Sequence, residues 1–226
     1  FENVFAALLE VCEKDAKKGD AKYTEIRTTT KSRFEASTKK VSMLRALPVS
    51  GTIFDDEIGA KVRAQVKKAE PYRPKFKVGK QELLDDFYDV FARNMRDLGT
   101  PVNDKRFFST LMDVLPDQTF IAVAYVDDQP VATGFLLVNG SMMEIPWAST
   151  IRDANKMNIN MWLYHQILHF AIEKNMQWFD FGRSTQDAGT YRFKKQWGAE
   201  PLQHYWYNFS AEPSEESLNP DNPKFK

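Results

Sequence analysis

The sequence predicts a mixed α/β fold, and three observations support this prediction. Strand-like runs follow one another at residues 119–126, 129–138 and 141–149. Asp127-Asp128 and Asn139-Gly140 connect them, and the second pair is typical of a tight hairpin, so the strands should be antiparallel neighbours. Apolar residues at helical spacing over 159–175 then precede a buried-type strand at 178–182, as in α/β proteins. The 17 Phe, 8 Tyr and 5 Trp supply ample core material.

The remaining elements follow from hydrophobic periodicity and from turn residues. Helices are predicted at residues 1–18, 54–70, 80–98, 105–115 and 190–197, and strands at 23–30, 41–47 and 202–209. Gly19-Asp20 should end the first helix, and Gly99 should end the helix that begins near residue 80. Pro71 and Pro74 interrupt the pattern, and we place a domain boundary beside them.

Composition narrows the functional classes. Thirty-one basic residues balance thirty-one acidic ones, so net charge does not favour nucleic acid or an anionic membrane. Cys12 is the single cysteine, which rules out an intrachain disulfide and fits a reducing cytoplasm. No apolar run approaches a membrane span and the N-terminus is not a signal peptide, so we expect a cytoplasmic chain without stable membrane insertion. Because Phe1 opens directly in a helical pattern, we expect that residues once preceded it.

Three runs carry a family resemblance. They are FARNMRDLGTP at 91–101, EIPWAS at 144–149, and FDFGRS at 179–184, which continues through GTYRFKKQWGAEP at 189–201. These runs resemble the FemAB family, and specifically the branch associated with bacterial exopolysaccharide and PEP-CTERM protein-sorting systems. Together they span most of residues 80–207 and are far more specific than a short motif.

The resemblance implies a fold and an activity. FemAB proteins contain two GNAT-like domains in tandem, and the better-known members transfer an amino acid from aminoacyl-tRNA to a peptidoglycan precursor. Residues 1–72 would then be the C-terminal remnant of a first GNAT-like domain with a basic linking helix. Residues 73–210 would be a complete GNAT-like domain, a mixed sheet flanked by helices. The tail at 211–226 is rich in Pro, Glu, Ser and Asn and is predicted to be disordered.

The activity implied by the resemblance is acyl or aminoacyl transfer to an amine of a cell-envelope or exopolysaccharide acceptor. A chain with an incomplete first domain need not be active by itself. Such transfer needs a deprotonated amine, a stabilised oxyanion and aligned substrates. The sequence shows no Ser-His-Asp or Cys-His arrangement, so we expect direct attack rather than a covalent intermediate.

Three residues are the catalytic candidates. Lys194 matches the lysine of the family's Gly-x-x-x-Phe-Lys pattern, where a fixed cation would stabilise an oxyanion or hold a phosphate. The alternative is a solvent-facing helix lysine. Arg183 follows a strand end and suits an anionic substrate group, or it pairs with Asp180 or Asp187.

Glu144 is the candidate base, because apolar neighbours in mid-strand would desolvate it and raise its pKa. Strand alternation would place Met143, Ile145 and Trp147 on the opposite face, so Glu144 could equally point to water. The predicted substrate-binding residues are Arg93, Asn94, Arg96, Asp97, Trp147, Tyr164, Asp180, Ser184 and Tyr191. Arg93 and Asp97 could instead pair on a solvated helix face, and aromatic residues more often pack in a core.

No cofactor or metal is predicted. The segment 149–158, where an acetyl-CoA enzyme of this fold would carry a glycine-rich pyrophosphate turn, contains no glycine, which disfavours CoA. His165 and His169 are four residues apart on one predicted helix, with Glu173 a turn further. Because the sequence shows no distant additional ligand, we predict no metal site there.

The basic segment 61–77 is the predicted contact for an aminoacyl-tRNA donor, and the acceptor would be a small envelope precursor, glycan or peptide. Two alternatives stay open. One is a CoA-dependent N-acetyltransferase with an unusual pyrophosphate site. The other is a non-catalytic module that binds a glycan or peptide.

Overall fold

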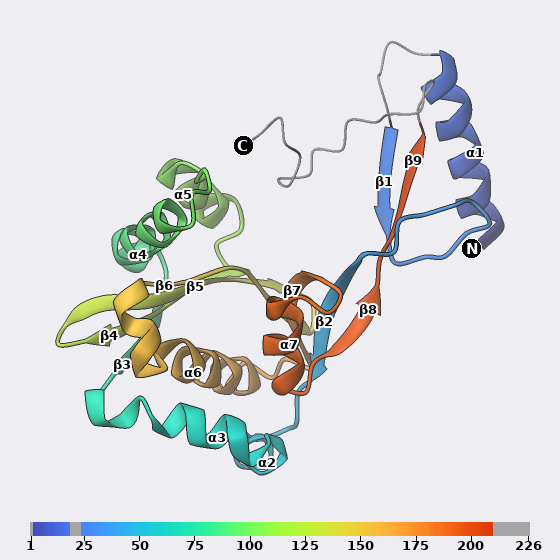
Figure 1. The fold of residues 1–226 in the computed structure, drawn as a ribbon. Helices are drawn as coiled ribbons and strands as arrows, with labels where there is room; N and C mark the ends of the chain where they lie inside the picture. Colours follow the sequence, from blue (N-terminus) through green and yellow to red (C-terminus); the bar gives the residue numbers. More distant parts are fainter. Residues whose placement is uncertain (1, 19–23, 210–226) are drawn as a thin grey trace. The chain divides into compact units, whose positions relative to one another are not determined.

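The computed structural model describes residues 2–18 and 24–209 and contains two compact units (Figure 1). One unit joins the described residues up to Val41 to those from Leu202 onward, and the other runs from Ser42 to Pro201. The predicted helix stop at Gly19-Asp20 and the predicted tail at 211–226 lie outside the described residues. The two units divide the chain at other positions than 72 and 73, and the domain assignment 1–72 and 73–210 stays a prediction.

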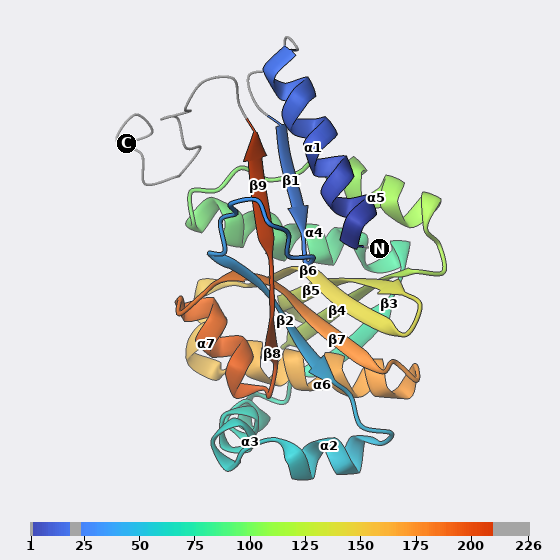
Figure 2. The ribbon, with the colours of Figure 1, turned by 90° about the vertical axis from the view of Figure 1, so that its right-hand side faces the viewer.

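A seven-stranded mixed sheet organises the larger unit. Its order is β3 (Lys75–Gly79), β4 (Thr119–Val126), β5 (Gln129–Asn139), β6 (Met142–Thr150), β7 (Trp178–Thr185), β2 (Lys40–Ala46) and β8 (Glu200–Gln203). Strands β3 to β6 are antiparallel to one another, and β7 lies parallel to β6. The mixed sheet that the sequence predicted is therefore confirmed (Figure 2).

Two tight turns fix the antiparallel part. Asp127 and Asp128 both have positive φ, at 50° and 58°, and close the two-residue turn between β4 and β5. Asn139 pairs with Met142, so the next turn consists of Gly140 and Ser141, with Gly140 at φ 58°. The predicted pairing of these strands is confirmed, with the second turn one residue later than the Asn-Gly pair.

Helices cover both faces of this sheet (Figure 1). On one face lie α4 (Leu84–Asp97) and α5 (Lys105–Val114), and the other carries α6 (Ile159–Glu173), with α2 (Gly51–Glu57) and α3 (Ala60–Lys67) packed on α6. The short helices η1 (Glu70–Tyr72), η2 (Gln81–Leu83), η3 (Arg152–Met157) and α7 (Gly189–Gln196) complete the unit. Four phenylalanines pack between α4, α5 and β5 with ring centroids 4.9 to 5.5 Å apart: Phe87, Phe91, Phe108 and Phe135.

Three expectations about elements were wrong. The single helix predicted at 54–70 is two helices, because Ile58 turns to extended backbone and buries its side chain, while Gly59 starts α3. The strand predicted at 202–209 is divided between β8 and β9 (Tyr205–Phe209). Strand β3 was missed because its exposed Lys75 and Lys77 at a sheet edge gave it the composition of a linker.

The smaller unit packs α1 (Glu2–Lys18) on an antiparallel pair formed by β1 (Thr24–Thr28) and β9. Its core is built around Leu9, Ala16, Tyr207 and Phe209. The Tyr207 hydroxyl accepts a hydrogen bond from the Ser32 backbone N–H at 2.6 Å and donates one to the Thr30 carbonyl at 3.1 Å. Within the described ranges, none of the helices has both the length and the apolar character to cross a bilayer.

Candidate functional site

The parallel strands β6 and β7 are paired over a short stretch only. Their register runs from Met142 opposite Trp178 to Glu144 opposite Asp180, and both strands continue for several more residues, to Thr150 and Thr185. Glu144 and Asp180 are therefore neighbours at the last pair, where the ladder between residues 142–150 and 178–185 ends. Beyond this point the backbone groups of β6 and β7 are not paired with each other. An extended substrate that lies between two strands needs such unpaired backbone groups.

A bulge in β6 decides which way its side chains point. Leu137 of β5 pairs with Glu144, but Phe135 pairs with Trp147, so β6 carries one extra residue in this interval. Ile145 reaches Ile167 of α6, since a Cβ placed on Gly134 would lie 2.8 and 3.2 Å from their side chains. Trp147 instead packs 5.7 Å from Phe135, under α5.

The prediction that Ile145 and Trp147 share a face is thus wrong, because the bulge reverses the alternation between them. Glu144 precedes the bulge and is on the face opposite Ile145, the same face as Trp147. The Glu144 side chain is half-buried. The alternative in which Glu144 points fully into water is therefore excluded.

Lys194 of α7 is buried and lies against the backbone of β7. Its Nζ donates hydrogen bonds to the carbonyl of Gly182 at 2.9 Å and to the carbonyl of Arg183 at 3.0 Å. The neighbouring Lys195 is exposed, so the solvent-facing alternative applies to that residue and not to Lys194. Gly182 has φ 78°, and its N–H donates to Asp180 Oδ1 at 2.7 Å. A glycine is required at this left-handed position, which turns two successive carbonyls toward Lys194.

The four charged groups at this point of β6 and β7 influence one another. Burial lowers the pKa of Lys194 to about 8, although the charges of Asp180 and Glu144 act in the opposite direction. Burial, together with the charge of Asp180, raises the pKa of Glu144 against the effect of Arg183 and Lys194. Perturbed acid and base groups that lie together are characteristic of functional sites.

Ser184 adds a buried hydroxyl on β7, two residues beyond Gly182. Within the described part of the chain, its Oγ has no hydrogen-bond partner. A buried polar atom left in this state is costly, and a bound ligand is one explanation for it. Arg183 is exposed, and its charge opposes the rise in the pKa of Glu144.

The polar residues at the end of α4 are arranged differently from the prediction. Arg93 pairs with Asp89 at 3.4 Å, not with Asp97, and Arg96 pairs with Asp97 at 3.5 Å. These ion pairs lie on an exposed helix end, where such pairs contribute little stability.

Asn94 faces inward from the same helix. Its Nδ2 donates to Ser149 Oγ at 3.2 Å and ties α4 to β6. Ser149 was not among the predicted site residues, and only the tertiary contact identifies it.

The predicted aromatic candidates are mainly packing residues. Tyr164 stacks on Phe181 with ring centroids 5.7 Å apart, and its burial raises its pKa. Tyr191 is buried on α7, and Trp147 packs against the aromatic cluster between α4, α5 and β5. These three rings pack in the core near the charged groups. A contact between any of them and a substrate stays a prediction.

The connection from β6 to α6 contains η3, and Asn158, with φ 55°, is the N-cap residue that precedes α6. Its side chain makes no capping hydrogen bond. The absence of a glycine in this connection is a fact of the sequence, and the exclusion of CoA stays a prediction.

The basic segment 61–77 spans α3, η1 and most of β3. Two of its cations are used internally: Lys75 pairs with Asp128 at 2.7 Å, and Arg63 donates to the backbone carbonyls of Asp55 and Ile58. Lys61, Lys67 and Lys68 are exposed on and beside α3.

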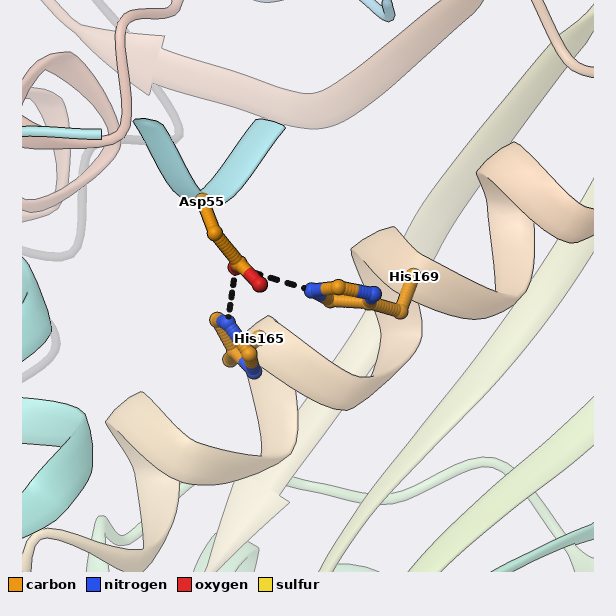
Figure 3. A group of neighbouring side chains, drawn as sticks. All are labelled: Asp55, His165 and His169. Atoms are coloured by element: carbon orange, nitrogen blue, oxygen red, sulfur yellow. Dashed lines mark hydrogen bonds and ion pairs between the residues drawn. The ribbon is translucent and has the colours of Figure 1, made fainter. Parts of the chain in front are cut away.

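A second group of titratable residues lies where α2 packs on α6. His165 and His169 of α6 meet Asp55 of α2 (Figure 3). Asp55 was not predicted as a ligand because it lies 110 residues before His165 in the sequence. Glu173, which had been weighed as a partner, is exposed, and the described residues that could jointly hold a metal ion are Asp55, His165 and His169.

The parallel pairing of β6 and β7 thus ends beside two acids and one buried cation: Glu144, Asp180 and Lys194. The sequence matches the family described as acetyltransferase (GNAT) domain over residues 59–195, more than half of the chain. The chain therefore belongs to the acetyltransferase (GNAT) domain family, a class of acyl-transferring enzymes.

Solved structures give the same fold at low identity. FemX is 12% identical with a TM-score of 0.66, over 91% of this chain and 77% of FemX. The C-terminal domain of a putative lysylphosphatidylglycerol synthetase from Agrobacterium fabrum is 16% identical with a TM-score of 0.60, over 88% of this chain and 64% of that one. A tandem GNAT protein from the clavulanic acid biosynthesis pathway is 11% identical with a TM-score of 0.58, over 92% and 70%. Comparison with curated protein sequences gives no match.

Proposed function

We propose that this chain transfers an acyl or aminoacyl group to an amine by direct attack at the charged cluster between β6 and β7. The observation that carries the proposal is the buried Lys194, which is held by two carbonyls beside Glu144, an acid whose pKa is raised. A cation and a base at one point of separated strands meet the two electrostatic needs of acyl transfer.

The reaction can be written with this chain's own residues. The amine nitrogen attacks the acyl carbon, and the proton that it loses passes to Glu144, whose raised pKa suits a general base. An ammonium group has three N–H donors, and Lys194 uses two of them on the carbonyls of Gly182 and Arg183. The third is available to the oxyanion, and collapse of the intermediate expels the donor's leaving group, which takes up the proton.

A variant set tests this proposal. With a competent donor and acceptor, Lys194→Met should lower kcat by about 10²- to 10³-fold, the usual cost of one oxyanion donor. Glu144→Gln should lower it by about 10²- to 10⁴-fold. Lys195→Met removes an exposed lysine from the same helix and should leave turnover near that of the unchanged chain. Unchanged kcat in Lys194→Met and Glu144→Gln would refute the assignment, and binding without turnover for any donor would favour the non-catalytic module.

The pH profile supplies a second readout. Turnover should rise as pH increases through the raised pKa of Glu144, because only its ionised form accepts a proton. It should fall again above about pH 8 as Lys194 loses its charge. Glu144→Gln should lose the acid limb and keep the alkaline one.

The donor is proposed to be an aminoacyl-tRNA and not acetyl-CoA. The glycine-free connection from β6 to α6, the FemAB-type sequence runs and the exposed lysines of the segment 61–77 support this choice. We propose a cell-envelope or exopolysaccharide precursor as acceptor and the cytoplasm as the place of reaction. The chain spans 64% of the lysylphosphatidylglycerol synthetase domain that it resembles in fold. The donor, the acceptor and the place of reaction are therefore proposals for the whole protein.

Two measurements separate the donors. Titration with acetyl-CoA should leave the unfolding temperature unchanged, and a clear concentration-dependent rise would instead favour the CoA-dependent N-acetyltransferase. Binding of aminoacyl-tRNA should weaken steeply with salt, since phosphate contacts release counterions, and a flat response would contradict it.

A further inference from the structure

Asp55, His165 and His169 form a compact group on the outer side of α6 (Figure 3). His165 Nε2 lies 2.7 Å and His169 Nε2 lies 3.0 Å from the same carboxylate oxygen, Asp55 Oδ1. The two imidazole rings are 4.4 Å apart, one helical turn from each other. Their ligand atoms all lie within 4.8 Å of one another.

The arrangement brings together the donor types that borderline metal ions prefer. Two imidazoles at positions i and i+4 of a helix with one carboxylate from another element are a common zinc ligand set. The side chains of His165 and His169 are 17% and 26% exposed, whereas that of Asp55 is 43% exposed. The histidines are thus held in place by the fold, while the carboxylate side stays open to an ion and to water.

The surroundings orient both rings. Phe54 packs 5.9 Å from His165 and 5.5 Å from His169, the latter edge to face. A Cβ at Gly51 would lie 2.5 Å from Nδ1 of His169, so a glycine at the start of α2 is what lets that ring approach. The Gln166 side-chain amide lies 3.4 Å from Nδ1 of His165. With this amide flipped, its side-chain oxygen accepts a hydrogen bond from Nδ1–H of His165 and leaves Nε2 as the ligand, which is the usual outer support of a metal-bound histidine.

Asp55 supplies a carboxylate ligand at the group, and each histidine supplies its Nε2 atom once that nitrogen is deprotonated, as metal binding requires.

We propose that Asp55, His165 and His169 bind one divalent transition-metal ion, with zinc the best match, and that water completes its tetrahedral coordination. The ion would join α2 to α6 and fix the helix pair on that face of the sheet. The three ligands are distinct from Lys194, Glu144 and Asp180, so the ion is assigned no part in the proposed transfer reaction. Its existence does not depend on the proposed transfer reaction.

The test uses the full chain without an affinity tag, after treatment with a chelator and dialysis. Calorimetric titration with zinc chloride should give one ion per chain, and the unfolding temperature should rise with zinc concentration. Asp55→Asn and His169→Gln should each weaken zinc binding on the order of 100-fold or more. Asp56→Asn, an exposed acid next to Asp55, is the matched control and should bind zinc like the unchanged chain.

Cobalt provides a readout that does not need a folded variant. Bound to the unchanged chain, Co²⁺ should give the intense visible absorption of a tetrahedral site without a thiolate charge-transfer band, because the proposed ligands contain no sulfur. Stoichiometric zinc should displace it. The proposal is overturned if the folded chain takes up no zinc or cobalt, if Asp55→Asn binds as tightly as Asp56→Asn, or if cobalt binds with a thiolate signature from Cys12.

Discussion

Replacement of Lys194 by Met should change how stability depends on pH. Lys194 is buried, and its pKa is lowered from 10.5 to about 8. Between these values the unfolded chain holds one more proton at this residue than the folded chain does. Stability therefore rises with pH across this window in the unchanged chain. Below about pH 8 both states are protonated, and the folded state bears the full cost of a buried ammonium.

The size of the effect follows from the difference of 10.5 − 8, about 2.5 pKa units. Each unit corresponds to about 1.4 kcal/mol, so the complete contribution is about 3 kcal/mol. Most of it, about 2.5 kcal/mol, falls between pH 7 and pH 10. Methionine also removes the donors to the Gly182 and Arg183 carbonyls, which costs about 1 kcal/mol for each bond but does not vary with pH.

Urea denaturation at pH 7, 8, 9 and 10 measures this difference. The free energy of unfolding of the unchanged chain minus that of Lys194→Met should increase by about 2.5 kcal/mol over this range. Lys195→Met, which removes an exposed lysine, should track the unchanged chain at every pH. A difference for Lys194→Met that stays constant within about 0.5 kcal/mol would refute the burial of a charged Lys194.

Three further predictions concern packing around the site, each measured as a change in urea midpoint. Gly134→Ala should destabilise the fold by about 1–3 kcal/mol, since the new Cβ would lie 2.8 Å from the side chain of Ile145. Gly189→Ala is the control: its Cβ meets nothing within 4 Å, and its free energy of unfolding should stay within about 0.5 kcal/mol of the unchanged chain. Thr133→Val removes a buried 2.8 Å hydrogen bond to the Ala122 carbonyl and should cost about 1 kcal/mol. Asn94→Ala removes the side-chain amide that donates to the buried Ser149 and should cost about 1–2 kcal/mol. For each of the three variants, an unchanged free energy of unfolding would contradict the contact from which its prediction is made.

Local patterns were sufficient for much of the fold. The order of strands around 119–150 follows from period-two alternation and two turns, and α6 follows from apolar residues at helical spacing, because both signals depend on neighbours along the chain. The same locality explains the failures. Ile58 and Gly59 divide a helix whose periodicity continues through them, since the burial of Ile58 outweighs propensity.

Some residues of the candidate site were named from the sequence. The family-type runs pointed to Lys194, Glu144 and Asp180, and the structure places these residues in one electrostatic cluster. The sequence could not show that Lys194 turns inward while Lys195 stays outside, because both fit a short helix equally well. Lys194 turns inward because it donates hydrogen bonds to the carbonyls of Gly182 and Arg183. These carbonyls come within its reach only when β7 is folded beside α7.

The sequence by itself therefore determined the α/β class and the antiparallel strands, and it predicted Lys194, Glu144 and Asp180 as candidates for the proposed transfer site. The tertiary structure alone decided the direction of side chains after the β6 bulge, the burial of Lys194 and the meeting of Asp55 with His165. The reason is physical: secondary structure reflects contacts a few residues apart, whereas a pKa, a hydrogen bond or a ligand set depends on groups that approach only when distant segments pack together.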